Sequence, residues 1–313
     1  MSNSKWPGPP GLIPVTSGHA DDANIINRNY LDRIMVEMRV IDANLPDLHT
    51  KIFGNMYDSP IMMPAFSHLN KAGITGRTPM EEYAKAATDL HLLNWVGMES
   101  NEEYEEIVKY APGSIRIIKP FADHARILSE IQFAKNHGAI AVGIDIDHIV
   151  GNDGNFDIVD AIPLGPITQE DLNTYVNAAS IPFIAKGVLS VQDACKAANA
   201  GCAGIVISHH HGRIPYGIPP LALLPDIKKA LQDKDVKIFV DCGMNSGYDA
   251  YKALALGADA VSVGRGILSP LLKDGSQGVI NKIQRMNEEL KQLMMYTGIA
   301  NTSSFDASVI HFL

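Results

Sequence analysis

One structural unit recurs along the chain from about residue 60 to the end. Each copy is a short apolar run, followed by a polar loop and then by an amphipathic helical stretch. Most of the runs are near-continuously apolar and rich in β-branched residues, which is typical of strands buried on both faces. Eight such runs occur, at residues 60–65, 92–97, 115–120, 140–146, 181–186, 204–208, 236–241 and 260–264.

The stretches between these runs carry helix start and stop signals. The stretch 190–201 begins at Ser190, a good N-cap, and ends at Gly201. The same pattern predicts further helices at residues 79–87, 102–110, 124–137, 168–179, 222–232, 246–257 and 277–298.

Strands that alternate with helices predict parallel strands joined by crossover helices. Eight units, and no Gly-x-Gly-x-x-Gly after the first strand, favour a closed (β/α)8 TIM barrel over an open doubly wound sheet. We expect residues 60–313 to form this α/β barrel. Residues 1–59 are expected to be an N-terminal extension, with one helix near 23–36, that packs on the barrel in a single domain overall.

Composition narrows the classes of partner. With 26 Lys and Arg against 35 Asp and Glu, the net charge is -9, which argues against broad binding to nucleic acid or an anionic membrane. The three cysteines form no CxxC motif, and no apolar run approaches the roughly 18 residues of a membrane span. These features, with no signal-peptide pattern, predict a cytoplasmic protein that acts on a small molecule.

In a barrel of this kind the active site lies at the carboxyl ends of the strands. Two glycine-containing segments, 241–247 and 263–266, follow the seventh and eighth strands and include Arg265. Each alone is more simply explained as a tight turn. Together on adjacent strands they favour a phosphate site, where backbone N–H groups at a helix N-terminus and the Arg265 guanidinium bind the anion.

A second group follows the fifth and sixth strands. Lys186 lies at a shielded strand end, where it needs either a structural ion pair or a functional partner. His210 is a candidate general base, and Arg213 is a candidate carboxylate ligand. Alternation along an extended strand places His209 and His211 on one side and His210 on the other, so the three histidines cannot all share one role.

These segments carry a specific resemblance. The segment 181–190 (Ile-Pro-Phe-Ile-Ala-Lys-Gly-Val-Leu-Ser) resembles the Lys-Gly-Val strand of the FMN-dependent α-hydroxy-acid oxidases and dehydrogenases. The segment 203–213 (Ala-Gly-Ile-Val-Ile-Ser-His-His-His-Gly-Arg) is similar to their Val-Ser-Asn-His-Gly-Gly-Arg segment. The segment 241–258 and the Val-Gly-Arg at 263–265 resemble their phosphate-binding loops, and the likeness extends from about residue 17 to 305.

The resemblance implies FMN as cofactor and a role for each matching residue. His210 matches the base, Asp147 the aspartate that pairs with it, Arg213 the carboxylate anchor, and Lys186 the lysine that stabilises reduced flavin. The implied cofactor-binding residues are Pro64, Ala65, Phe66, Lys119, Asp145, Lys186, Ser208, Asp241, Gly243, Asn245, Gly264 and Arg265. No resident metal is implied, and the family suggests a homo-oligomer, specifically a homotetramer.

The chain also departs from the family pattern. Lys119 replaces a glutamine and Asp145 a threonine, both of them flavin contacts. Phe121 replaces a tyrosine, Glu99 a tryptophan and Asn245 an arginine, while the tyrosine usual before Ser17-Gly18 is missing and the stretch 148–180 is short. The expected function is therefore FMN-dependent oxidation of a 2-hydroxy acid or a related carboxylate-bearing substrate, bulkier and less standard than lactate or glycolate.

Other functions remain open from the sequence. One is a metal-dependent barrel enzyme, whose ligands would be Asp145, Asp147, His148, His209 and His211. Another is a redox-neutral isomerase that keeps FMN as an acid–base catalyst. A non-catalytic binding role would leave Lys186, His210 and Arg213 unexplained.

Overall fold

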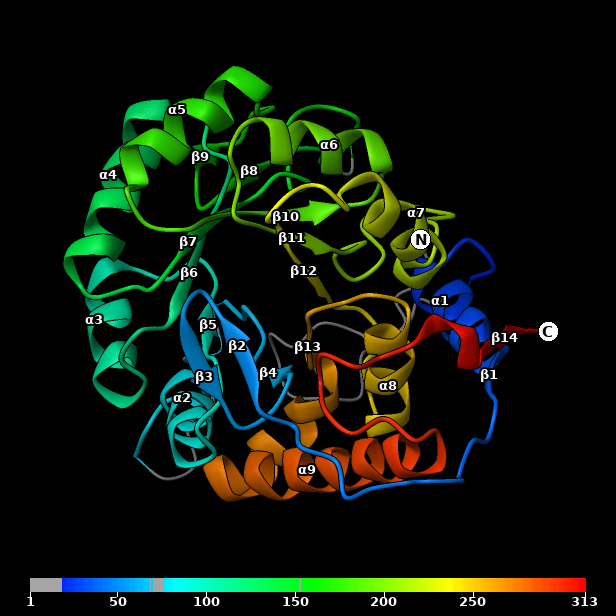
Figure 1. The fold of residues 1–313 in the computed structure, drawn as a ribbon. Helices are drawn as coiled ribbons and strands as arrows, with labels where there is room; N and C mark the ends of the chain where they lie inside the picture. Colours follow the sequence, from blue (N-terminus) through cyan, green and yellow to red (C-terminus); the bar gives the residue numbers. More distant parts are fainter. Residues whose placement is uncertain (1–18, 68, 70–75, 152) are drawn as a thin grey trace.

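Eight parallel strands form a barrel, as predicted. The structure is a computed structural model that describes residues 19–67, 69, 76–151 and 153–313. The strands follow the order β4-β13-β12-β11-β10-β7-β6-β5 around the sheet (Figure 1). Their bounds are β4 Ile61–Met62, β5 Trp95–Val96, β6 Ile115–Ile118, β7 Val142–Asp145, β10 Phe183–Val188, β11 Gly204–Ile207, β12 Lys237–Val240 and β13 Ala260–Ser262.

Backbone hydrogen bonds between the first and last strands of this order close the sheet. The Met63 N–H donates to the Leu93 carbonyl at 3.1 Å, and the Gly97 N–H donates to the Phe66 carbonyl at 2.7 Å. All carboxyl ends of the strands therefore face one mouth of the barrel, where an active site is expected.

Helices surround this barrel (Figure 1). Thr78, Ser100, Thr168 and Ser246 each begin a helix with a capping box, and Ser190 is an N-cap as predicted. The bounds are α2 Pro79–Asp89, α3 Asn101–Tyr110, α4 His124–Asn136, α5 Gln169–Ala179, α6 Val191–Asn199, α7 Pro220–Ala230, α8 Gly247–Ala255 and α9 Leu268–Tyr296. Helix α9 consists of two helical segments that meet at a non-helical kink at Gly275 (φ 60°), and the second segment begins close to the predicted residue 277.

A hairpin that the sequence did not predict closes the opposite mouth. Strands β2 (Thr50–Ile52) and β3 (Asn55–Tyr57) pair antiparallel next to the barrel (Figure 1). Ile52 belongs to the core cluster inside the barrel, and the Phe53 ring lies 6.0 Å from the Phe239 ring. This part of the expected N-terminal extension thus completes the core at the amino ends of the strands.

The helix predicted near 23–36 is shorter than expected. Helix α1 spans Ala23–Asp32, and the chain then forms strand β1 (Ile34–Val36), which pairs antiparallel with β14 (Ile310–Phe312) near the C-terminus. A second unpredicted hairpin, β8 (Ile158–Val159) with β9 (Ile162–Pro163), lies between β7 and α5. The division into an extension at 1–59 and a barrel at 60–313 stays a prediction.

None of the described helices combines the length and apolar character needed to cross a membrane.

Candidate active site

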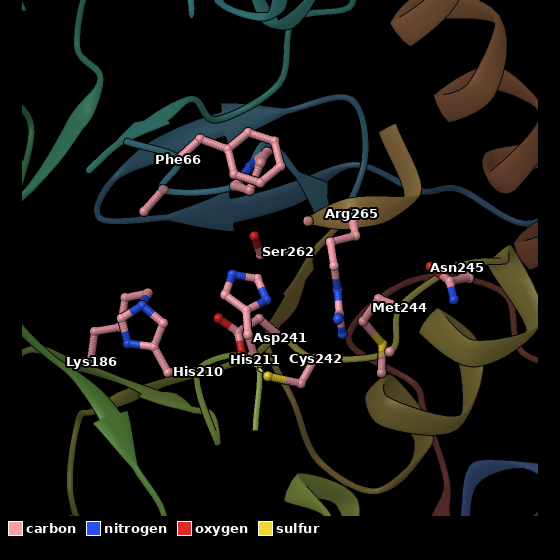
Figure 2. Close-up of a pocket in the computed structure, with 14 residues that line it drawn as sticks. Phe66, Lys186, His210, His211, Asp241, Cys242, Met244, Asn245, Ser262 and Arg265 are labelled. Carbon is pink, nitrogen blue, oxygen red and sulfur yellow. Dashed lines mark hydrogen bonds between the residues drawn. The ribbon is translucent and has the colours of Figure 1, made fainter. Parts of the chain in front are cut away.

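A cavity of about 240 Å³ lies at the carboxyl ends of the strands. Figure 2 shows the side chains on its walls, with Lys186 and His210 toward one end and Arg265 and Asn245 toward the other. The lining residues are Pro64, Ala65, Phe66, Lys186, His210, His211, Asp241, Cys242, Gly243, Met244, Asn245, Ser262, Gly264 and Arg265.

The imidazole of His210 is held by the partly buried carboxylate of Asp147. Its Nδ1 lies 3.1 and 3.0 Å from the two carboxylate oxygens of Asp147, so Nε2 is the nitrogen left for other partners. Burial tends to raise the pKa of Asp147, but the interaction with His210 outweighs burial and the pKa is lowered. Asp147 packs against the α-carbon of Gly187 (φ +91°), where a side chain would not fit.

Lys186 reaches the cavity from strand β10. Its Nζ donates to Oδ1 of Asp145 at 2.8 Å, and Nζ of Lys119 donates to Oδ2 of the same carboxylate at 2.6 Å. Burial alone would lower the pKa of Lys186, but Asp145 and other nearby carboxylates raise it above its ordinary value. The Lys186 side chain is therefore protonated and places a positive charge on the cavity wall.

Arg265 supplies a second cation, at the other end of the cavity. Its guanidinium donates to Oδ1 of Asn24 in α1, whose amide also donates to the His211 carbonyl at 3.0 Å. Helix α1 thus fastens the loops after β11 and β13 to each other.

The N-terminus of α8 does not offer the free donors that the sequence suggested. The N–H groups of Asn245 and Ser246 both donate to Asp249, and the N–H of Gly247 donates to Glu289 at 2.8 Å. That expectation was wrong because Asp249 caps its own helix, and Glu289 of α9 binds the next N–H group. Arg265 is consequently the main candidate for an anion at this end.

Arg213 does not line the cavity. Its Nη1 lies 4.0 Å from Oδ2 of Asp157, and that same oxygen lies 2.9 Å from Nε2 of His148. Burial, together with the charges of Lys119 and Arg213, lowers the pKa of His148 to about 4. His148 is therefore neutral near pH 7, and Asp157 remains the anion beside Arg213.

With this geometry in place, comparisons with known proteins identify the family. The profile described as FMN-dependent dehydrogenase matches residues 12–167 and 164–312, which together span most of the chain. The chain belongs to the FMN-dependent dehydrogenase family. The resemblance seen in the sequence is thereby confirmed.

Named relatives and solved structures agree with this family. Glycolate oxidase of Spinacia oleracea is 27% identical over 91% of this chain and 86% of its own length. L-lactate oxidase of Nostoc sp. is 27% identical over 94% and 92%. A structure of mandelate oxidase superposes with a TM-score of 0.82 at 25% identity, and the match covers 96% of this chain and 92% of that one. A mandelate oxidase variant with an FMN adduct superposes with a TM-score of 0.79 at 27% identity, and the match covers 94% of this chain and 92% of that one. The chain is an FMN-dependent hydroxy-acid oxidoreductase.

The cavity of this family member suits the cofactor FMN. A cation stands at each end, Lys186 and Arg265, and FMN carries a phosphate and gains negative charge when reduced. A Cβ placed on Gly264 would meet no atom within 4 Å, so the backbone there borders open space. The residues present therefore fit FMN.

The structure separates the predicted site residues into two sets. Ten of them form the cavity wall: Pro64, Ala65, Phe66, Lys186, His210, Asp241, Gly243, Asn245, Gly264 and Arg265. The others, Lys119, Asp145, Asp147, Ser208 and Arg213, are not on that wall. The first four contact other residues of the site, whereas Arg213 lies beside Asp157. The individual roles of all these residues stay predictions.

Sequence reasoning missed four lining residues, His211, Cys242, Met244 and Ser262. Cys242 follows Asp241 directly, and burial with the adjacent Asp241 charge raises the pKa of its thiol to about 12. The protonated thiol donates to Oδ1 of Asp241 at 2.9 Å. His211, Cys242 and Met244 each adjoin a predicted ligand in the sequence, whereas Ser262 does not.

The predicted orientation of the three histidines was wrong. Strand β11 ends at Ile207, and His210 and His211 have φ values of 45° and 65°, so the alternation of an extended strand does not apply. His211 lines the same cavity as His210, whereas His209 is buried, with its Nδ1 accepting the Gly212 N–H at 2.9 Å. The three still differ in environment.

The alternative metal site is not assembled as the sequence suggested. In the described part of the chain, the carboxylates of Asp145 and Asp147 gather with His210, while His148 pairs with Asp157. Two lysine ammonium groups already neutralise Asp145.

The position before Ser17, where the family usually has a tyrosine, lies outside the residues that the structure describes.

Acid should destabilise this chain because His148, His209 and His211 are all held neutral. Burial is the leading cause that lowers each pKa, to about 4 for His148. The unfolded chain binds protons at these histidines below about pH 6.5, whereas the folded chain does not, so stability present above that pH is lost as the pH falls toward 4.

We expect Tm to fall steadily between pH 6.5 and 4, by about 2–4 °C for each kcal/mol lost. Thermal unfolding followed by circular dichroism measures it. His148→Gln should flatten the slope, and the exposed His91→Ala should not change it. A Tm independent of pH across this window would contradict the prediction.

Proposed function

We propose that this enzyme oxidises a 2-hydroxy acid through His210, Asp147, Lys186 and Arg213. The observation that supports this most is the meeting of His210, fixed by Asp147, with the charged Lys186 on one wall of a cavity that suits FMN. A base and a cation on the same wall provide what removal of a hydroxyl proton and reduction of a flavin require.

Bound FMN supplies a two-electron acceptor for the C–H bond of the carbon that bears the hydroxyl. His210 accepts the hydroxyl proton at Nε2, since Nδ1 is held by Asp147. Asp147 carries a negative charge and stabilises the resulting imidazolium. Lys186 balances the negative charge that accumulates at the cofactor.

The same proposal makes Arg213 the anchor for the substrate carboxylate. The Asp157 carboxylate, 4.0 Å from the guanidinium, competes for that position. Small acids that depend on a single carboxylate contact are weakened most by this competition. This supports a substrate bulkier than lactate or glycolate, one that gains further binding energy elsewhere.

Asp157→Asn should therefore improve the binding of small 2-hydroxy acids. The amide keeps an acceptor for His148 and removes the charge beside Arg213. The expected decrease in KM is about 1.4- to fivefold, which corresponds to the ~0.2–1 kcal/mol typical of a partly exposed ion pair. Asp153→Asn on the same loop is the control, and an unchanged KM in Asp157→Asn would show that Asp157 does not compete.

A panel of 2-hydroxy acids mixed anaerobically with the yellow enzyme tests the proposed function. Bleaching of the flavin by a 2-hydroxy acid supports oxidation, and product formation without bleaching supports the redox-neutral isomerase instead. Reoxidation by air or by an added acceptor then distinguishes an oxidase from a dehydrogenase. The homotetramer implied by the resemblance stays a prediction, which sedimentation velocity would test.

A further inference from the structure

Two departures from the family pattern meet in the structure. Asp145 ends strand β7, between β6 and β10 in the barrel, and it faces Lys119 from one side and Lys186 from the other. Each of its oxygens accepts one lysine, Oδ2 from Lys119 at 2.6 Å and Oδ1 from Lys186 at 2.8 Å. All three side chains are at least 92% shielded from solvent.

The three groups depend on one another electrostatically. Burial would raise the pKa of Asp145, but Lys119 and Lys186 hold it well below its ordinary value. A buried ion pair that loses one partner leaves an uncompensated charge, which is strongly unfavourable. The trio therefore carries a net charge of +1, the same as one lysine among neutral neighbours.

Only one member of the trio reaches the cavity. Lys186 lines its wall, whereas Lys119 and Asp145 do not. An effect of these two residues on a bound molecule must therefore pass mainly through Lys186. Asp145 also lies 4.0 Å from Nδ1 of His210, so the trio adjoins the proposed base as well.

We propose that Lys119 and Asp145 are positioning residues that set the direction and effective charge of Lys186, and thereby the reduction potential of bound FMN. Asp145 holds the Lys186 ammonium and weakens its field in the cavity. Lys119 counters Asp145 and restores that field. This proposal rests on the proposed role of Lys186 beside the cofactor.

Charge-altering variants of the FMN-loaded enzyme test the idea. Lys119→Gln leaves Asp145 paired with Lys186 alone, which should lower the midpoint potential and weaken sulfite binding to the flavin by about tenfold. Asp145→Thr frees Lys186 from its carboxylate and should shift both quantities the other way. The double variant Lys119→Gln/Asp145→Thr should return both close to the unaltered enzyme, because its net charge is again +1.

Controls separate this role from a merely structural one. Lys119→Arg keeps the charge and should keep the potential, even if packing lowers Tm. Lys237→Gln breaks a more exposed ion pair with Asp259, 2.9 Å long at the start of β12, and should leave the potential unchanged. If Asp145→Thr fails to fold, Asp145→Asn serves in its place.

Shifts in the same direction for both single variants, or no recovery in the double variant, would overturn the proposal. The potential is measured by dye-coupled reduction without any substrate. A failure of the proposed 2-hydroxy-acid oxidation would therefore leave these shifts intact, so the two proposals can fail separately.

Discussion

Replacing His210 with alanine should nearly abolish reduction of the flavin by substrate while the protein remains yellow. The imidazole is the proposed acceptor of the hydroxyl proton, and Asp147 cannot replace it because its carboxylate lies behind His210. Loss of a general base costs about 10²–10⁴-fold in rate. Anaerobic stopped-flow absorbance at saturating substrate measures this decrease directly.

His91→Ala provides the matched control. His91 also forms a histidine–aspartate pair, with Nδ1 2.8 Å from Asp58, but it lies before β5, away from the cavity. Its removal should leave the rate of flavin reduction unchanged. A His210→Ala enzyme that reduces its flavin at the rate of the unaltered enzyme would disprove the assignment of the base.

Gly187→Ala should damage both stability and catalysis. A Cβ at this position would lie 2.2 Å from Oδ1 and 2.7 Å from Cβ of Asp147, so the whole aspartate must move. The backbone φ of +91° adds left-handed strain of about 1–2 kcal/mol for a residue with a side chain. Displacing Asp147 releases His210, and misplacement of about 1 Å in a catalytic group can cost ~10²-fold in rate.

Gly138→Ala is a control that introduces the backbone strain of a positive φ without displacing Asp147. Gly138 has a similar φ of +80°, but a Cβ there would meet nothing within 4 Å. Both variants should lower Tm, and only Gly187→Ala should slow substrate-driven flavin reduction. An equal rate in the two variants would mean that Asp147 does not position the base.

The barrel was predictable because its strands are buried on both faces. Runs such as 204–208 and 238–240 are apolar and rich in β-branched residues, which marks them as strands without reference to any partner. The hairpin β2–β3 was missed because its turn residues are Phe53 and Gly54, with φ values of 46° and 85°, in place of the Asn-Gly that signals such a turn.

The site was only partly predictable, since much of it depends on contacts between strands. Lys119 and Asp145 each looked like a separate replacement of a neutral residue, and only the neighbouring positions of β6, β7 and β10 make them partners. The contact of Asp157 with Arg213 likewise depends on the path of an irregular loop, which no local pattern specifies.

Three residues on the cavity wall, His210, His211 and Cys242, have backbones in the left-handed region, with φ of 45°, 65° and 67°. Such conformations cost on the order of 1–3 kcal/mol each for residues other than glycine. Glycine would adopt them without that cost, so the side chains that build the cavity are held at the expense of thermal stability. The mouth of this barrel is thus a place where stability and activity oppose each other, and selection for heat resistance alone would erode the site.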